Sequence, residues 1–520
     1  MKIGIFLGYG PRQLDPHQGI SRLITFIIKG AIQSPDTKVL IAGSGWIREG
    51  IYEILDDAGI PRSAVQIVTT RGEPPALRIF EAIKGIRNRP RRPRDKLRLA
   101  ERFIIRTTEI VADWLATTNI IVFAAGVAVL FFIALALAVP VLVAMVFVLL
   151  ALLGRRAVRR ALSMGTRGIF RRAGRLLRNS IRDAGPTERI RARELYRVVK
   201  MANRQKDISV WYVPSMFWPE VSRLRGKVVM GAPDIVFYEF PLQFRDESAR
   251  RALKRISGSV AAADRLICYS EHVKQKHLVE MNDVPPGRVS VIRHGIVDMR
   301  GTEDFGRDDA LSVLHSYIEK KHYQLLPYLR GFRFDDVEFL FYSSQPRPYK
   351  NIEGLTRVFE RILREHYRPI KLILTGNILA NQRVSRLVES RGLEKDVISL
   401  PNVPNNVLGA LYKLSALSVT PTQFEGGFPF TFSEAYSVGT PSVMSRIPVV
   451  TEIVKDERLL EAMTFLPEDR EDMVRKILWG LDNRDELLRL QAPLYEELSK
   501  RTWRSVAGEY LDVMREVASG

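Results

Sequence analysis

Two glutamates flank a glycine pair in the stretch TPTQFEGGFPFTFSEAYSVGTPSVMSRIPVV, which spans residues 420–450. Glu425 stands directly before Gly426 and Gly427, and eight residues separate it from Glu434. An ionised carboxylate accepts several hydrogen bonds, and glycine leaves the backbone N–H open to a ligand. The pattern therefore indicates a site for a hydroxyl-rich ligand such as a sugar. The alternative is that Glu434 is only an acid in the first turn of a helix, where the macrodipole favours it.

Two further stretches combine small residues with a predicted helix start. In FLFYSSQPRPYKNIEGL a strand is followed by a loop that carries Arg347 and Lys350, and Asn351 stands where a helix could begin. Two cations beside a helix N-terminus favour a diphosphate, and the alternative is a solvated loop with incidental charge. The opening loop at residues 8–19 ends in Gly19 before another predicted helix, which also favours an anion.

The elements that must position these residues alternate between strand and helix on both sides of a long apolar insert. Such alternation predicts an α/β protein with parallel sheets, here two doubly wound, Rossmann-like domains facing a cleft. In sheets of this kind, ligands bind at the carboxyl ends of the strands. The predicted organisation is an N-terminal domain at 1–75 and 206–300, an insert at 76–205, a connection at 301–336, a C-terminal domain at 337–500 and a helix at 501–520.

Residues 120–153 form an uninterrupted run of 34 uncharged, mostly apolar residues. A run longer than about 18 apolar residues predicts a membrane helix rather than a buried core helix. Because one domain cannot straddle a bilayer, we expect a re-entrant or hairpin segment bent near Pro140, which enters and leaves on one side. A single long, tilted span is the alternative.

The net charge of +21 is concentrated on the two sides of this run. Residues 84–106 hold ten Lys or Arg against two acids, and residues 155–182 hold ten Arg and no acid. Basic flanks stay on the cytoplasmic side, and beside a bilayer segment they favour anionic lipids over nucleic acid. We therefore expect anionic membrane lipids as partners, and no nucleic acid.

The one cysteine, Cys268, excludes an internal disulfide framework.

The order of these stretches resembles a family-4 retaining glycosyltransferase of the GT-B fold. The stretch with the paired glutamates and the following Gly-Thr-Pro is the most specific. The similar stretches are GISR near the start, ADRLICYSEHVKQ from residue 263, PRPYKNIEGL, LTGN, LPNVPNNVLGALY from residue 400 and FEGGFPFTFSEAYSVGTPSVMS.

The resemblance implies transfer of a sugar from a nucleotide-diphosphate sugar, a UDP- or GDP-sugar, without metal or cofactor. Glu434 would bind the ribose, Glu425 would face the donor sugar, and Lys350 with Arg347 would hold the diphosphate. The full set of implied residues is Glu425, Lys350 and Arg347 for catalysis, Glu434, Gly426, Gly427, Phe428, Gly19 and Gln345 for the donor, and Asp234, Ser21 and Arg22 on the acceptor side.

The chain departs from the family pattern at several of these positions. The family separates its two glutamates by seven residues, and this chain by eight. Gln345 replaces an arginine, for which we expect Arg347 to substitute, and Pro233 replaces a histidine beside Asp234. These departures leave open a second hypothesis, a non-catalytic, membrane-bound sensor or scaffold for sugar nucleotides.

The insert predicts the acceptor class. An enzyme with its N-terminal domain at a bilayer would glycosylate a lipid-linked saccharide or glycolipid. We therefore expect a role in cell-surface polysaccharide assembly, at the cytoplasmic face of a bacterial inner membrane.

Overall fold

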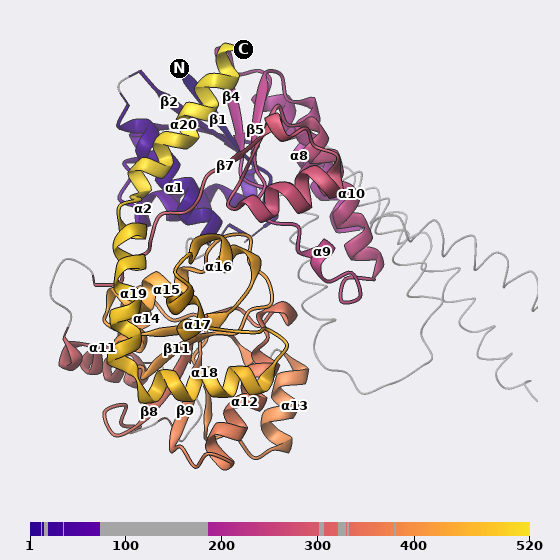
Figure 1. The fold of residues 1–520 in the computed structure, drawn as a ribbon. Coiled ribbons are helices and arrows are strands. Elements are labelled where there is room, and N and C mark those ends of the chain that lie inside the picture. The colour runs from indigo at the N-terminus through magenta and orange to yellow at the C-terminus, as the bar shows by residue number, and fades with distance from the viewer. Residues whose placement is uncertain are drawn as a thin grey trace, which may run out of the picture.

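The computed structural model describes residues 1–11, 13–14, 19–34, 36–72, 186–300, 306–320, 329, 332–378 and 381–520. These residues form two α/β lobes, one above the other in Figure 1, with the N-terminal lobe in indigo to magenta and the C-terminal lobe in orange.

The N-terminal lobe is built on a seven-stranded parallel sheet. Its strands are β1 (Lys2–Leu7), β2 (Lys38–Gly43), β3 (Val65–Thr69), β4 (Val210–Val213), β5 (Lys227–Gly231), β6 (Arg265–Cys268) and β7 (Val289–Val291). The strand order is β3-β2-β1-β4-β5-β6-β7. The strands are short apolar runs such as KIGIFL, because a parallel sheet between two helix layers is buried on both faces.

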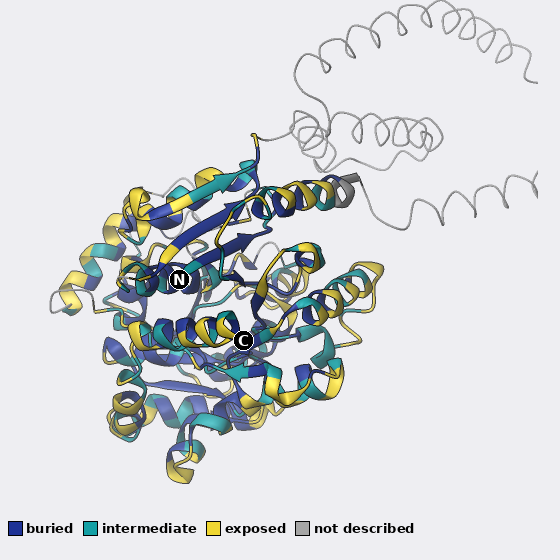
Figure 2. Cartoon of the chain, turned by 90° about the horizontal axis from the view of Figure 1, so that it is seen from above, coloured by how far each residue is buried: buried dark blue, intermediate teal, exposed yellow. Residues whose placement is uncertain are grey.

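Helices cover both faces of this sheet. One face packs against α1 (Gly19–Ile32), α2 (Arg48–Asp57) and α20 (Trp503–Ser519). The other face packs against α8 (Pro186–Ala202) and α10 (Glu247–Ala262). Figure 2 shows the buried strands in dark blue and the outward sides of the helices in yellow.

The C-terminal lobe repeats this plan with six parallel strands. They are β8 (Glu338–Tyr342), β9 (Ile370–Leu374), β10 (Val397–Ser399), β11 (Leu417–Thr420), β12 (Ser442–Ser445) and β13 (Thr464–Phe465). Their order is β10-β9-β8-β11-β12-β13, so that successive strands are added to one edge of β8 up to β10 and to its other edge from β11 onward. This switch point is where a doubly wound sheet opens a ligand crevice.

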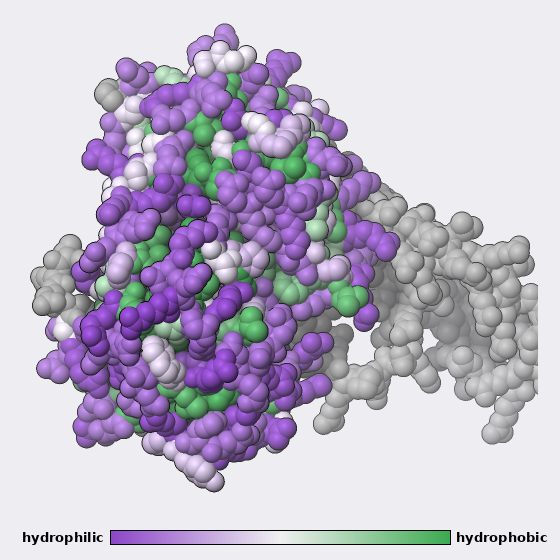
Figure 3. Space-filling view, viewed as in Figure 1, coloured by the Kyte–Doolittle hydropathy of each residue, from purple (hydrophilic) through white to green (hydrophobic). Residues whose placement is uncertain are grey.

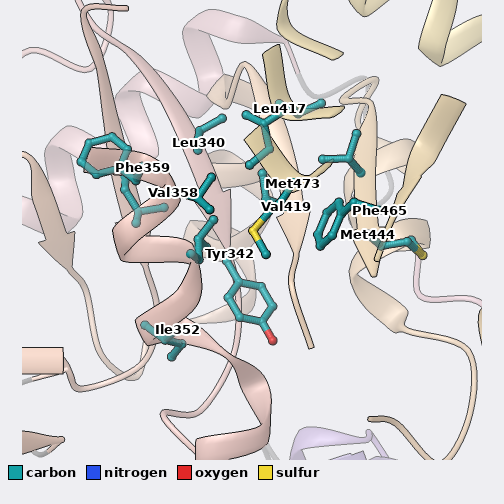
Figure 4. Packing of buried hydrophobic residues seen from close by; sticks show 14 of the residues in the cluster. Leu340, Tyr342, Ile352, Val358, Phe359, Leu417, Val419, Met444, Phe465 and Met473 are labelled. Carbon is teal, nitrogen blue, oxygen red and sulfur yellow. The ribbon is translucent and has the colours of Figure 1, made fainter. Parts of the chain in front are cut away.

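Helices also cover both faces of the second sheet. One face carries α11 (Arg307–Lys320) and α14 (Asn405–Leu414). The other carries α12 (Ile352–Arg364), α13 (Gln382–Ser390), α16 (Pro448–Ile453), α17 (Glu457–Met463), α18 (Arg470–Asp482) and α19 (Arg484–Ser499). Figure 4 shows Val358 and Phe359 of α12 lying against the sheet near Leu340, and Met444 beside Phe465.

The chain ends by crossing back to the first lobe. In Figure 1, α19 and α20 run along one side of both lobes, and the two termini lie at the same end of the molecule. Val506, Tyr510 and Met514 of α20 are buried in the N-terminal core. The terminal helix therefore ties the lobes together.

Two predicted boundaries need correction. The insert was predicted to extend to residue 205, but Leu195, Val198 and Val199 of α8 are buried against the N-terminal sheet. Similarly, α11 lies within the predicted connection at 301–336, yet Ala310 and Leu314 pack in the C-terminal core. Both helices bury an apolar stripe at helical spacing, so each belongs to a domain.

The apolar run at 120–153 and the two basic clusters lie outside the described residues. Among the residues that the structure does describe, no helix is long and apolar enough to cross a membrane. The face seen in Figure 3 is mostly hydrophilic, with smaller hydrophobic areas on both lobes.

Candidate active site

A cavity of about 440 Å³ lies between the lobes, where the strands of both sheets end. It brings together seven of the twelve predicted site residues. These are Gly19 and Asp234 from the N-terminal lobe and Gln345, Arg347, Lys350, Glu425 and Glu434 from the C-terminal lobe. The predicted residues thus include every Asp, Glu, Lys and Arg among the residues that line this cavity.

Lys350 and Glu425 form an ion pair on the donor side of the cavity. Lys350 ends a short 3₁₀ turn at Pro348–Lys350, and Asn351 then adopts a left-handed conformation with φ of 53° before α12 begins. Burial disfavours the Lys350 ammonium, but the Glu425 carboxylate outweighs this, so the pKa of Lys350 is raised. The lysine therefore remains a cation at the cavity wall.

Arg347 lies on the same turn and is held by two neighbours. Its guanidinium donates to the Tyr349 hydroxyl at 2.8 Å and to Gln345 Oε1 at 3.0 Å. Gln345 thus orients Arg347. Gln345, which replaces the family's arginine, and Arg347, its expected substitute, are therefore hydrogen-bonded to each other. Both hydrogen-bond partners of the Arg347 guanidinium are uncharged.

Glu434 lies in α15 (Phe430–Ser437) and is 7% exposed. The Tyr412 hydroxyl of α14 donates to Glu434 Oε2 at 2.8 Å. Burial raises the pKa of Glu434, while Tyr412 and the charge of Arg22 act in the opposite direction. One carboxylate oxygen is thus fixed by the protein, and the residue lines the cavity.

Gly426 and Gly427 face the N-terminal lobe. The Ser270 hydroxyl donates to Gly426 O at 2.9 Å, and a Cβ at Gly426 would collide with Pro233 O. A Cβ at Gly427 would lie 3.1 Å from the His294 ring. The two glycines therefore let the lobes approach closely at the edge of the cavity. Phe428 packs against the C-terminal core.

The three residues predicted for the acceptor side, Asp234, Ser21 and Arg22, lie in three different environments. Asp234 follows β5 and lines the cavity, and its pKa is raised mainly by burial and further by Glu425. Ser21 is 3% exposed, within the face of α1 that packs on the sheet. Arg22 instead reaches the other lobe, where it donates to Asn405 Oδ1 at 2.6 Å.

The sequence reasoning missed His294, which follows β7 and lines the cavity. Its ring lies 4.0 Å from that of Tyr269 and 4.8 Å from that of Phe430. Burial lowers the pKa of His294 to about 4, so its imidazole is neutral at physiological pH. The strand before it, VSV, has only three residues and gives no recognisable strand pattern in the sequence. For that reason, the sequence did not indicate that His294 follows the end of a strand.

Among the described residues, one group has the composition of a metal site, namely Glu239, His272 and His277. None of these three residues lines the cavity.

The comparisons with known proteins fit this architecture. Residues 331–499 match the family model described as glycosyl transferases group 1. A glycosyltransferase of Methanocaldococcus jannaschii, described as uncharacterised, is 26% identical over 189 residues, 35% of this chain and 45% of that protein. The O-antigen chain mannosyltransferase B of Escherichia coli is 23% identical over 252 residues, 48% of this chain and 60% of that protein. The chain thus spans about half the length of the curated relatives it matches.

Among solved structures, Anabaena HepE in complex with UDP and glucose matches over 99% of this chain and 100% of its own, with 12% identity and a TM-score of 0.57. The two sheets, the cleft and this match define a GT-B-like α/β protein. The C-terminal domain, residues 331–499, is similar to the group 1 glycosyl transferases.

Proposed function

We propose that the protein is a membrane-associated, retaining glycosyltransferase. It moves a sugar from a nucleotide-diphosphate sugar to a lipid-linked saccharide or glycolipid. The observation that carries the proposal is the set of charged side chains gathered in one cavity between the lobes. There, the paired Lys350 and Glu425, the ribose-type carboxylate Glu434 and the opposite Asp234 face one space.

The donor belongs to the C-terminal lobe. Glu434 keeps one oxygen on Tyr412 and accepts ribose hydroxyls with the other. Lys350 and Arg347 meet the diphosphate, whose negative charge grows as the glycosidic bond breaks. Fixed cations at a buried site stabilise such developing charge without reorganisation. UDP- and GDP-sugars are the favoured donors, and HepE, which was solved with UDP, supports the first of them.

The reaction needs no protein nucleophile in this scheme. The bond from the sugar carbon to the diphosphate breaks, and the acceptor oxygen bonds to that carbon on the same face. The hydroxyl proton passes to the departing phosphate. Glu425 faces the sugar, so that its placement contributes more than its basicity. No step in this scheme requires a metal ion.

The acceptor belongs to the N-terminal lobe. In this scheme Asp234, which lines the same cavity, accepts a hydrogen bond from the acceptor hydroxyl. The apolar run at 120–153 and its basic flanks are inserted in this lobe, between Gly72 and Pro186. We therefore propose a lipid-linked acceptor at the cytoplasmic face of a bacterial inner membrane, in surface polysaccharide assembly.

The test uses the full-length protein, purified in detergent. UDP-, GDP- and ADP-sugars are offered in turn with a bacterial polyprenyl-linked lipid extract, and labelled sugar in the lipid phase is counted. Glu434→Ala is the control variant. The anomeric configuration of the product, read by NMR, tests retention, and an excess of EDTA tests the independence from metal.

Transfer from one nucleotide sugar, lost in Glu434→Ala, is the expected result. Thermal protection by a nucleotide without any transfer would favour the sensor hypothesis instead. Absence of both transfer and protection with every nucleotide would overturn the proposed function.

A further inference from the structure

The chain leaves the N-terminal sheet directly before Asp234. After β5, Ala232 still donates to Ile267 O at 2.7 Å, but Ile235 has φ of −128° and ψ of 73° and lies outside regular structure. Ile235 is 1% exposed, so its N–H cannot be satisfied by water. The N–H donates instead to His277 Nδ1 at 3.0 Å.

This bond decides the tautomer of His277. A neutral imidazole has one nitrogen with a proton and one without. Because Nδ1 accepts from Ile235, Nε2 must carry the proton, and it lies 2.9 Å from Glu239 Oε1. The carboxylate of Glu239 therefore fixes the imidazole, and the imidazole fixes the backbone beside Asp234.

The helix that carries His277 has an unusual winding. η4 (Val273–Glu280) is a π-helix, and the residue before it is His272. In an α-helix, residues five apart point about 140° away from each other, whereas the wider π-turn brings them near one face. His272 Nε2 accordingly lies 3.3 Å from the same Glu239 Oε1. The π-helix thus gathers both imidazoles on one carboxylate.

A bound metal ion is the competing explanation for this group. However, the Lys276 ammonium lies 3.0 Å from Glu239 Oε1 and already supplies a positive charge. Coordination through His277 Nε2 would also require its proton to move to Nδ1, which would break the bond from Ile235. The hydrogen bonds thus favour a positioning role over a metal site.

The turn held in this way touches the donor loop of the other lobe. Gly426 packs against Pro233 and Asp234, and Phe240 stacks on Tyr349 at 6.0 Å between ring centroids. Glu239 lies between these two contacts in sequence. We propose that His277 and Glu239 are positioning residues, which hold the Asp234 carboxylate at the acceptor side of the cavity. This inference rests on the proposed transferase function.

The test is a double-mutant cycle on the full-length protein in detergent. Asp234→Asn, His277→Ala and the double variant are compared in kcat/KM for the acceptor. His277→Asn and His277→Gln form the matched pair, because the Asn oxygen falls near the place of Nδ1 and the Gln amide near that of Nε2. Nucleotide affinity and thermal midpoint serve as controls for folding.

We expect His277→Ala to lower kcat/KM by about 10- to 100-fold, since small displacements at a reacting centre are costly. In the Asp234→Asn background the further loss should be less than about threefold, because the two residues act as one unit. His277→Asn and Glu239→Gln should retain most of the wild-type kcat/KM, whereas His277→Gln should lose about as much as His277→Ala. Nucleotide affinity should stay within about twofold of wild type. Additive losses, or equal defects in His277→Asn and His277→Ala, would overturn the proposal.

A second measurement separates this inference from the proposed function. Solid-state ¹⁵N spectra of histidine-labelled protein, with His277→Asn used for assignment, report the tautomer whether or not transfer occurs. A protonated Nε2 with an unprotonated Nδ1 supports the arrangement. A protonated Nδ1 overturns it, as does Zn²⁺ binding that is lost in Glu239→Gln.

Discussion

The donor and acceptor sides of the cavity are built in opposite ways. On the donor side, polar side chains hold one another within a single lobe, as in the Lys350–Glu425 pair and the Tyr412–Glu434 hydrogen bond. On the acceptor side, Asp234 is held through the backbone, by residues that lie in sequence on either side of α10. Under the proposed function, this preformed donor side faces one constant ligand, the nucleotide diphosphate.

This difference predicts how the effects of substitutions should combine on each side of the cavity. A charge-paired wall depends on a few side chains, so single substitutions should have large and separate effects. A wall held through backbone and packing depends on a network, so substitutions should act together. The following experiments separate these two behaviours.

The largest effect is expected from Lys350→Ala. The substitution removes a fixed cation from the diphosphate and leaves the half-buried Glu425 unpaired. We expect kcat for transfer to fall about 10²- to 10³-fold, the usual loss on removing one group that stabilises developing charge. Single-turnover transfer with saturating donor measures it.

Lys371→Ala is the matched control, because Lys371 pairs with Asp396 in the same lobe but outside the cavity lining. It should transfer sugar at nearly the wild-type rate. Equal activity of Lys350→Ala and wild type would break the assignment of the donor side.

Nucleotide affinity should respond next, to Glu434→Ala. A buried charged partner of ribose contributes about 1.5–3 kcal/mol, which corresponds to a loss of roughly 10- to 100-fold in affinity. Tyr412→Phe removes only the hydroxyl that orients Glu434, and should cost about fivefold. Calorimetric titration with UDP and GDP measures both.

Tyr510→Phe controls for the loss of a buried tyrosine hydroxyl, since Tyr510 lies in the N-terminal core. Nucleotide affinity in this variant should match wild type. A similar loss in all three variants would point to general destabilisation in place of a ribose contact.

The same contrast explains what the sequence could predict. Lys350, Glu425 and Glu434 lie in two continuous stretches, each a strand end followed by a helix start, and these stretches predicted that the three residues share a site. The alternation of strands and helices along the chain predicted the doubly wound fold. The acceptor side joins residues of β5, α9 (Val236–Glu239) and η4, whose contacts depend on a π-helix that no apolar period reveals. The sequence could therefore show Asp234 but not what holds it.

Where the two sides meet, His294 should make stability depend on pH. Its pKa is about 4 in the folded protein and 6.5 when unperturbed. Between these values the unfolded state binds more protons, so stability is lost as pH falls from about 6.5 towards 4. From pH 7 to 5 this amounts to at most about 2 kcal/mol.

Thermal midpoints at pH 7 and 5 test this for wild type and His294→Gln. The acid-induced drop should be smaller in the variant by at most about 4–8 °C, at about 2–4 °C per kcal/mol for a domain of this size. Equal drops in both proteins would show that His294 is already solvated or charged in the fold. His315→Gln on α11, a residue outside the cavity lining, provides the comparison.

The smallest effect concerns Arg22, which belongs to the acceptor side by sequence and contacts the donor side in the structure. Its bond to Asn405 is exposed, and such surface contacts contribute at most about 1 kcal/mol. Arg22→Ala should therefore weaken nucleotide binding by no more than about fivefold, and Asn405→Ala should do the same. The double variant should be no worse than either single one, because both remove one contact between α1 and α14. If Arg22→Ala instead raises the acceptor KM and leaves nucleotide affinity unchanged, Arg22 acts where its sequence position predicts, and the bond to Asn405 has no part in holding the lobes together.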